Sequence, residues 1–144
     1  MRAALAIVLA FLAAGCGQSK PDPLPPTCSN GPGDVLRALR KAPDNVALSD
    51  GTLLSECVKR AFDDADLQEL GYSFTPAADR LASRADATAA FQLGFLLGAV
   101  RRGAKQTNGV HLELVRRIES TVTFDDPALQ SAVRRGAAAG ERKG

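Results

Sequence analysis

Residues 87–100, ATAAFQLGFLLGAV, are apolar on nearly all sides of a helix, and this stretch constrains the fold more than any other. A surface helix has one apolar stripe and one polar face, whereas a helix that is apolar all round has to be covered by other elements. The stretch is also shorter than the roughly 17 residues that the shortest membrane-spanning helices need. We therefore expect a helix at the centre of an all-α bundle.

Gly94 and Gly98 give this helix a G-x-x-x-G spacing, which lets two helix backbones approach closely. In a short helix outside a membrane, we favour packing against another helix of the same chain. Contact with a second copy of the chain is the alternative.

Other segments predict shorter helices around the central one. Apolar side chains recur at helical spacing in residues 54–62 and 110–122, and Asp126-Pro127 predicts the start of a last helix. The first of these stripes includes Phe62 and the second includes Val110, so both side chains are expected to face the core. Asp34 favours the start of a short helix that ends before Pro43.

Residues 64–85 are expected to form two elements, a short helical turn that Gly71 ends and a second helix that Thr75 and Pro76 begin. Asp50-Gly51 predicts a minor turn or a β-hairpin near residues 46–53. The prediction is an all-α bundle of about five helices in residues 34–136, followed by a charged, flexible tail in residues 137–144.

The first fifteen residues have the organisation of a secretory signal peptide. Arg2 supplies the positive charge, an uncharged apolar run of about ten residues follows, and the small residues Ala13, Ala14 and Gly15 precede Cys16. We therefore expect residues 1–15 to be a cleaved signal peptide.

The sequence LAAGC at residues 12–16 resembles the lipobox of bacterial lipoproteins, a resemblance confined to residues 1–16. It implies that Cys16 carries a diacylglycerol thioether and an acylated amino group, with palmitate among the fatty acids, and that the chain is cut before it. Several acyl chains hold a protein stably on a bilayer. The expected location is the outer side of a bacterial cell membrane or outer membrane. The alternative is an ordinary cleaved signal that leaves Cys16 as a free thiol.

Residues 16–33 are expected to form a tether behind this anchor. Residues 17–33 include five prolines among small and polar residues, and such a composition favours extended chain. The tether would lift the domain on the order of 30 Å from the bilayer at about 3.1 Å per residue.

Cys28 and Cys57 remain after Cys16 is assigned to the anchor, and in an oxidising compartment they can pair only with each other. We expect a disulfide. Two free thiols are the alternative, and a metal site is weaker still because the chain has one histidine and no C-x-x-C spacing.

No motif for catalysis, phosphate binding or metal binding occurs in the sequence. His111 is the only histidine and is expected to be a half-buried packing residue of its helix. A cluster of acidic residues lacks the sequence order of a calcium-binding loop. We expect these residues to lie at solvent-exposed helix ends. They are Glu56, Asp63, Asp64, Asp66 and Glu69. Three arginine pairs, at residues 101–102, 116–117 and 134–135, are expected to offset helix dipoles, with contact to anionic lipids as the alternative.

A formal net charge of +2, from 18 basic and 16 acidic residues, argues against nucleic acid as a partner. We expect a membrane-anchored, non-enzymatic module without cofactor or metal, whose partners are the membrane and an envelope protein. The alternatives are a carrier with a closed cavity for a small ligand, and a small envelope hydrolase that uses His111.

Overall fold

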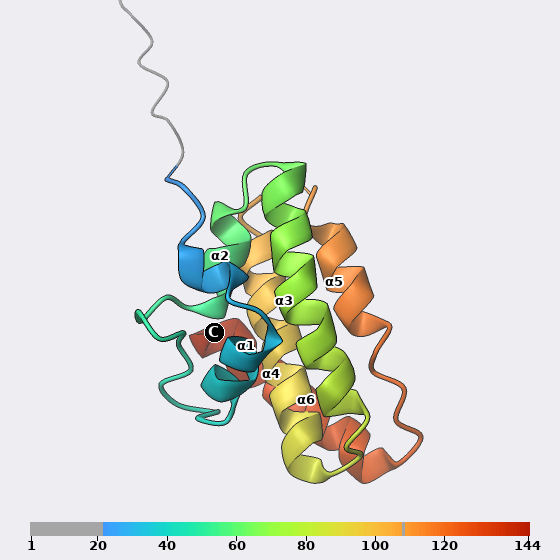
Figure 1. Ribbon diagram of the computed structural model, residues 1–144. Helices are drawn as coiled ribbons and strands as arrows, with labels where there is room; N and C mark the ends of the chain where they lie inside the picture. Colours follow the sequence, from blue (N-terminus) through green and yellow to red (C-terminus); the bar gives the residue numbers. More distant parts are fainter. Residues whose placement is uncertain (1–21, 108) are drawn as a thin grey trace, which may run out of the picture.

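A computed structural model describes residues 22–107 and 109–144. The described part is all-α and contains six helices and a 3-10 turn, with no strand (Figure 1). In chain order the elements are η1 (Pro26–Ser29), α1 (Pro32–Leu39), α2 (Leu54–Arg60), α3 (Asp64–Ala82), α4 (Ala87–Ala104), α5 (Leu112–Glu119) and α6 (Pro127–Lys143). The all-α prediction is confirmed, with one helix more than the five expected. None of the described helices is both long and apolar enough to cross a membrane.

Helix α4 is the centre of the bundle, as its sequence predicts. Every residue from Gln92 to Val100 is buried, and α4 packs against α2, α3, α5 and α6. Asp86 begins the helix, because its Oδ1 accepts a hydrogen bond from the backbone N–H of Ala89 at 2.8 Å. A side-chain cap of this kind satisfies one of the backbone donors that a helix leaves open at its first turn.

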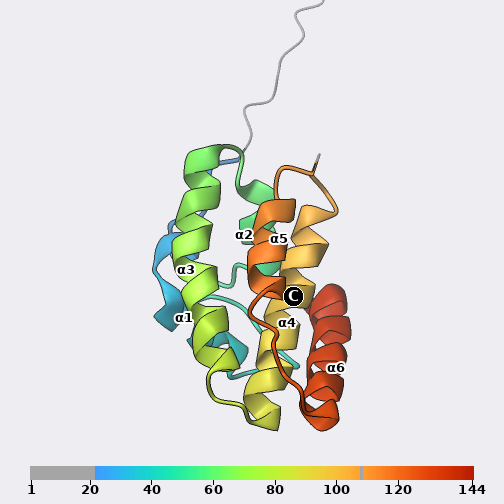
Figure 2. The ribbon, with the colours of Figure 1, turned by 90° about the vertical axis from the view of Figure 1, so that its right-hand side faces the viewer.

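Glycines on both helices let α4 and α6 pack at very short range (Figure 2). A Cβ atom built on Gly94 or Gly98 would lie 2.1 Å from a backbone oxygen of α6. The reverse holds for Gly136 and Gly140, where a Cβ would lie 2.0 Å and 2.1 Å from backbone oxygens of α4. The expected packing of Gly94 and Gly98 within the same chain is confirmed.

The predicted flexible tail is wrong. Residues 137–144 are the second half of α6 and its cap, and Ala137, Ala139 and Gly140 are buried. The buried Ser55 hydroxyl of α2 donates to the backbone oxygen of Gly144 at 2.5 Å. Glycine and charge suggested fraying, but here the glycines are the surface that meets α4. The predicted end of the helical domain at residue 136 is wrong for the same reason.

Helix α3 is one continuous helix rather than two short ones. Gly71 and Pro76 both lie inside it. A single buried stripe passes both residues at helical spacing and includes Leu70, Phe74 and Leu81. Packing of that stripe outweighs the local preferences of glycine and proline for helix ends.

The predicted tether of residues 16–33 is too long. Leu24 packs partly buried against the core, Pro25 and Cys28 are buried, and η1 and α1 begin at residues 26 and 32. The folded domain therefore starts near Leu24 and not at residue 34. The predicted signal peptide, the lipobox-like sequence and Cys16 lie outside the described residues.

The disulfide between Cys28 and Cys57 is confirmed, with the two Cα atoms 5.7 Å apart. It joins η1 to α2, so the first folded residues are clamped to the bundle. This distance is within the usual range for a cystine.

The turn predicted near residues 46–53 is confirmed, without strands on either side. The N–H of Gly51 donates to the Leu48 oxygen at 3.0 Å, and the N–H of Leu48 donates to the Thr52 oxygen at 2.9 Å. Gly51 has a φ of +88°, which glycine adopts at little cost.

Candidate functional site

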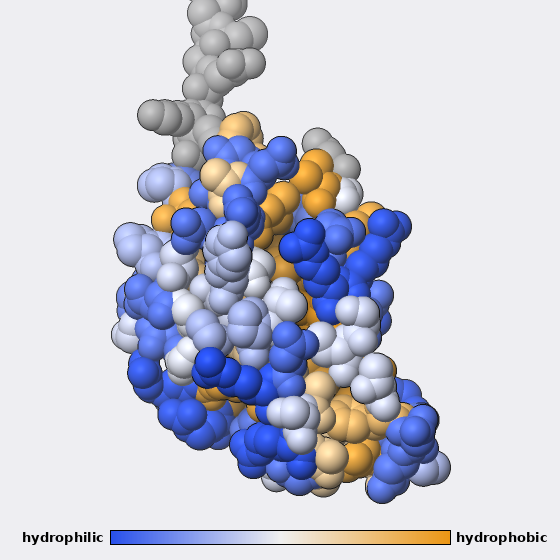
Figure 3. All heavy atoms as spheres, turned by 45° about the vertical axis from the view of Figure 1, so that its right-hand side comes forward, coloured by the Kyte–Doolittle hydropathy of each residue, from blue (hydrophilic) through white to orange (hydrophobic). Residues whose placement is uncertain are grey.

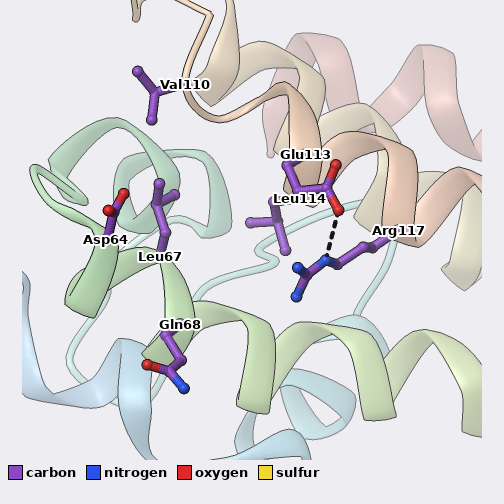
Figure 4. A pocket seen from close by; sticks show the side chains of 7 residues that line it. All are labelled: Asp64, Leu67, Gln68, Val110, Glu113, Leu114 and Arg117. Atoms are coloured by element: carbon purple, nitrogen blue, oxygen red, sulfur yellow. Dashed lines mark hydrogen bonds and ion pairs between the residues drawn. The ribbon is translucent and has the colours of Figure 1, made fainter.

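A surface groove of about 360 Å³ lies between the first half of α3 and α5 (Figure 4). Its floor and one end are apolar, with Leu114 buried, Leu67 half-buried and Val110 exposed. The remaining lining residues are exposed and polar. They are Asp64, Gln68, Glu113 and Arg117.

The polar rim of the groove contains one ion pair. The Nε of Arg117 donates to the Glu113 carboxylate at 3.0 Å, one helical turn away on α5. An exposed pair at this spacing contributes little to stability, so both side chains can turn to meet another molecule. An apolar floor with a polar rim suits an apolar side chain of a partner flanked by polar groups.

The groove differs from the closed cavity that a small-ligand carrier needs. Most of its lining side chains face solvent, whereas carrier pockets bury most of their ligand. Two further hollows on the described surface also have a charged lining. One is lined by Asp22, Glu56, Lys59, Arg60 and Phe62, and the other by Leu97, Arg101, Glu119, Val122, Val133, Arg134 and Ala137.

His111 lies in the protein interior and lines none of these hollows. Only 5% of its surface is exposed, which is less than the half-buried position expected. Its Nε2 is hydrogen-bonded to the backbone oxygen of Ala61 at 2.7 Å, and its Nδ1 is buried with no hydrogen-bond partner among the described residues. A hydrolase would need this ring to reach both a substrate and a carboxylate. The observed role is to join the segment before α5 to the segment after α2.

Two of the acidic residues near residue 64, Asp63 and Asp66, fix the start of helix α3, as expected for acidic residues at a helix end. The side chain of Asp63 accepts from the N–H of Asp66 at 2.9 Å, and Asp66 accepts in return from the N–H of Phe62 at 2.8 Å. Such reciprocal bonds are similar to the capping-box arrangement. Within the described residues, no group of histidine, cysteine and acidic side chains is arranged to hold a metal ion.

Of the two arginine pairs predicted near helix ends, the first is confirmed and the last is not. Arg101 and Arg102 lie in the last turn of α4, where they offset its dipole, and Arg101 also pairs with Glu119 at 2.5 Å. The pair at residues 134–135 lies in the middle of α6, because that helix continues to Lys143. Its predicted position at a helix end is therefore wrong.

The chain matches no protein-family model, no curated protein and no solved structure. Its functional assignment therefore depends on its own residues.

Two exposed apolar side chains were predicted to be buried. Phe62 is 74% exposed and Val110 is 59% exposed. Helix α2 ends at Arg60 because Asp63 already caps the next helix, so Phe62 falls in the connection and points outward. Val110 precedes α5, which begins at Leu112. The cap signal at Asp63 was present in the sequence and could have removed Phe62 from the predicted stripe.

Proposed function

We propose that the protein is an exported, lipid-anchored and non-enzymatic module that binds another protein of the bacterial envelope through the groove between α3 and α5. The observation that carries the proposal is the disulfide between Cys28 and Cys57. It accounts for two of the three cysteines and leaves Cys16 as the third.

The disulfide supports export because such bonds persist mainly in oxidising compartments outside the cytoplasm. Export requires an address, and residues 1–15 have the charge and apolar length of a signal peptide. Cys16 then stands directly after the small residues at which the leader would be cut. Acyl chains on this cysteine would retain at the membrane a domain whose described helices do not cross it.

The groove supports binding rather than catalysis as the role of the domain. It combines the apolar side chains of Leu67 and Leu114 with an exposed charged rim. Its lining contains no histidine, cysteine or serine that could act as a nucleophile or imidazole base. The open groove gives little support to a small-ligand carrier, and the buried position of His111 gives little support to a hydrolase.

Cell fractionation of the Cys16→Ser variant tests the anchor. We expect the wild type in the membrane fraction, with mass spectrometry finding a diacylglycerol thioether on Cys16 and no leader. The variant should appear in the soluble extracytoplasmic fraction. The double variant Cys28→Ala with Cys57→Ala is the control, because it removes two cysteines and keeps the anchor. A wild-type protein with an unmodified Cys16 would contradict the proposal.

The same cells test the groove. A photo-crosslinking amino acid at Gln68, an exposed lining residue, should give a discrete adduct with one envelope protein. Placed at Thr88, which is exposed at the start of α4, the same group should not. The substitution Leu67→Asp should abolish the adduct at Gln68, since it places a charge in the apolar part of the groove. An adduct that survives Leu67→Asp would mean that the partner binds elsewhere.

A further inference from the structure

One end of the bundle displays three large apolar side chains to solvent. Phe62, Val110 and Leu112 are 74%, 59% and 47% exposed. They belong to the α2–α3 and α4–α5 connections and the first residue of α5, which lie at the same end of the molecule in both ribbon views (Figures 1 and 2). We call these three residues the apolar apex.

Hydrogen bonds fix the apolar apex in place. The bond between His111 Nε2 and the Ala61 oxygen holds the residue before Phe62 against the residue between Val110 and Leu112. The N–H of Phe62 is held in addition by the Asp66 carboxylate. The three side chains are therefore presented together by a buried contact, and their exposure is built into the fold. Figure 3 shows that apolar surface at this end continues down the face of the molecule between polar residues.

The start of the described chain lies at the same end. Asp22 and Phe62 line one surface hollow, of about 250 Å³. Cys16 precedes Asp22 by six residues, and six residues span at most about 20 Å when fully extended. If Cys16 carries the acyl chains, Asp22 is held within this distance of the bilayer surface, and Phe62 lies on the same hollow as Asp22.

We propose that the apolar apex docks on the phospholipid bilayer to which the protein is anchored, with Phe62 and Val110 entering the interface between headgroups and acyl chains. This inference depends on the proposed lipid anchor. Exposed apolar side chains with polar groups around them favour such an interface. The anchor keeps the surface at high local concentration, so a contact too weak to hold a free protein suffices here.

The charges around the apolar apex show which kind of contact this is. Lys59 and Arg60 precede Phe62, and Asp63 and Asp64 follow it. Asp22 and Glu56 line the same hollow as Phe62, and Glu113 follows Leu112. Carboxylates therefore outnumber the two cations around the apolar apex. An anionic surface gains no net attraction there, so burial of apolar side chains is the main contribution. The contact should therefore respond weakly to salt and to the share of anionic lipid.

Tryptophan fluorescence can test the contact, because the chain contains no tryptophan. The variant Phe62→Trp places a single reporter in the apolar apex, and Val110→Trp places a second. Thr88→Trp is the matched control: Thr88 is exposed and lies sixteen residues before the end of α4 at Ala104, about 24 Å along the helix axis. Each protein is purified from membranes, its acylation is verified by mass spectrometry, and it is reconstituted into phosphatidylethanolamine and phosphatidylglycerol vesicles.

Vesicles with brominated acyl chains should cause a loss of fluorescence at positions 62 and 110 and none at position 88. The loss should persist at high salt and in vesicles made with zwitterionic phosphatidylcholine alone. Circular dichroism of each variant should match the wild type, since all three sites are exposed.

Three results would overturn the inference, and they separate it from the proposed anchor. In one result, an aqueous quencher reduces the fluorescence of an acylated Phe62→Trp protein and brominated lipid does not. The proposed anchor would then be retained, and the proposed contact between the apolar apex and the bilayer would be excluded. If the same reporter is shielded from both quenchers, a second copy or another protein covers the apex. A protein with unmodified Cys16 would overturn the anchor and this inference together.

Discussion

Individual side chains show where sequence patterns succeed and fail. Cys28 and Cys57 could be paired from the sequence once Cys16 was assigned to the expected anchor, and that pairing is observed. Phe62 and Val110 were misplaced because an apolar spacing was continued beyond the helix that carries it. His111 was correctly expected to pack, but its bond to the Ala61 oxygen depends on two segments that only the tertiary structure brings together.

A pH prediction belongs to Asp86, the residue that begins α4. The hydrogen bond from the Ala89 N–H, followed by the charge of Arg84, holds the pKa of this carboxyl below its ordinary value of 3.8. A carboxyl whose pKa is lower in the folded state stabilises the fold above its unfolded pKa, and this stabilisation disappears as the pH falls through the folded pKa. Asparagine also caps helices well, so Asp86→Asn isolates the charge.

We expect Asp86→Asn to be less stable than the wild type near neutral pH and to lose less of its free energy of unfolding as the pH falls below about 4. Urea unfolding at a series of pH values measures both effects. Glu69→Gln removes one exposed carboxylate without removing a cap and serves as the control. Parallel curves for the wild type and Asp86→Asn would contradict the assignment.

At the scale of elements, the burial of a helix could be predicted better than its ends. The burial of helix α4 could be predicted from its own sequence, because a helix that is apolar on all sides is not stable when exposed to water. The structural role of the glycines in residues 136–144 could not be predicted from that segment alone. They let the backbone of α4 approach closely, which is visible only in the packed bundle. Helix α3 continues through Pro76 because its buried stripe does, which is a property of the packed bundle.

The contact between α4 and α6 gives a prediction with a matched control. Gly98→Ala would place a methyl group 2.1 Å from the Ala137 oxygen, so the two backbones must separate. We expect a loss of about 3 kcal/mol in the free energy of unfolding, at the upper end of typical overpacking costs. Gly33→Ala in α1 has open space within 4 Å, and should be neutral or stabilising by about 0.4–1 kcal/mol. Urea unfolding compares the two, and equal stability would exclude the tight packing.

For the molecule as a whole, the disulfide fixes the first folded residues to the body of the bundle. It closes a loop with a sequence separation of 29 residues. The general architecture and this bond could be predicted from the sequence. The groove and the apolar apex could not be predicted from the sequence. Each combines residues of α3 or the connection before it with residues in or just before α5, and these two segments are far apart in the chain.

Reduction of the disulfide should lower the free energy of unfolding by about 3–4 kcal/mol, the amount expected from loop closure alone. Urea unfolding with and without a reducing agent measures this difference. The double variant Cys28→Ala with Cys57→Ala should be destabilised and insensitive to the reductant. A urea midpoint of the wild type that stays the same after full reduction of the disulfide would contradict the prediction.

The position of α6 also has a consequence for the order of events during synthesis. Helix α4 cannot be covered until α6 arrives, and Ser55 finds its partner in Gly144, 89 residues later. Contacts this distant in sequence form late, since a long loop has to close first. A growing chain therefore cannot complete the cover of α4 until α6 has emerged. If the protein is exported as proposed, a translocation channel that admits only unfolded polypeptide would meet little native structure to undo before that point.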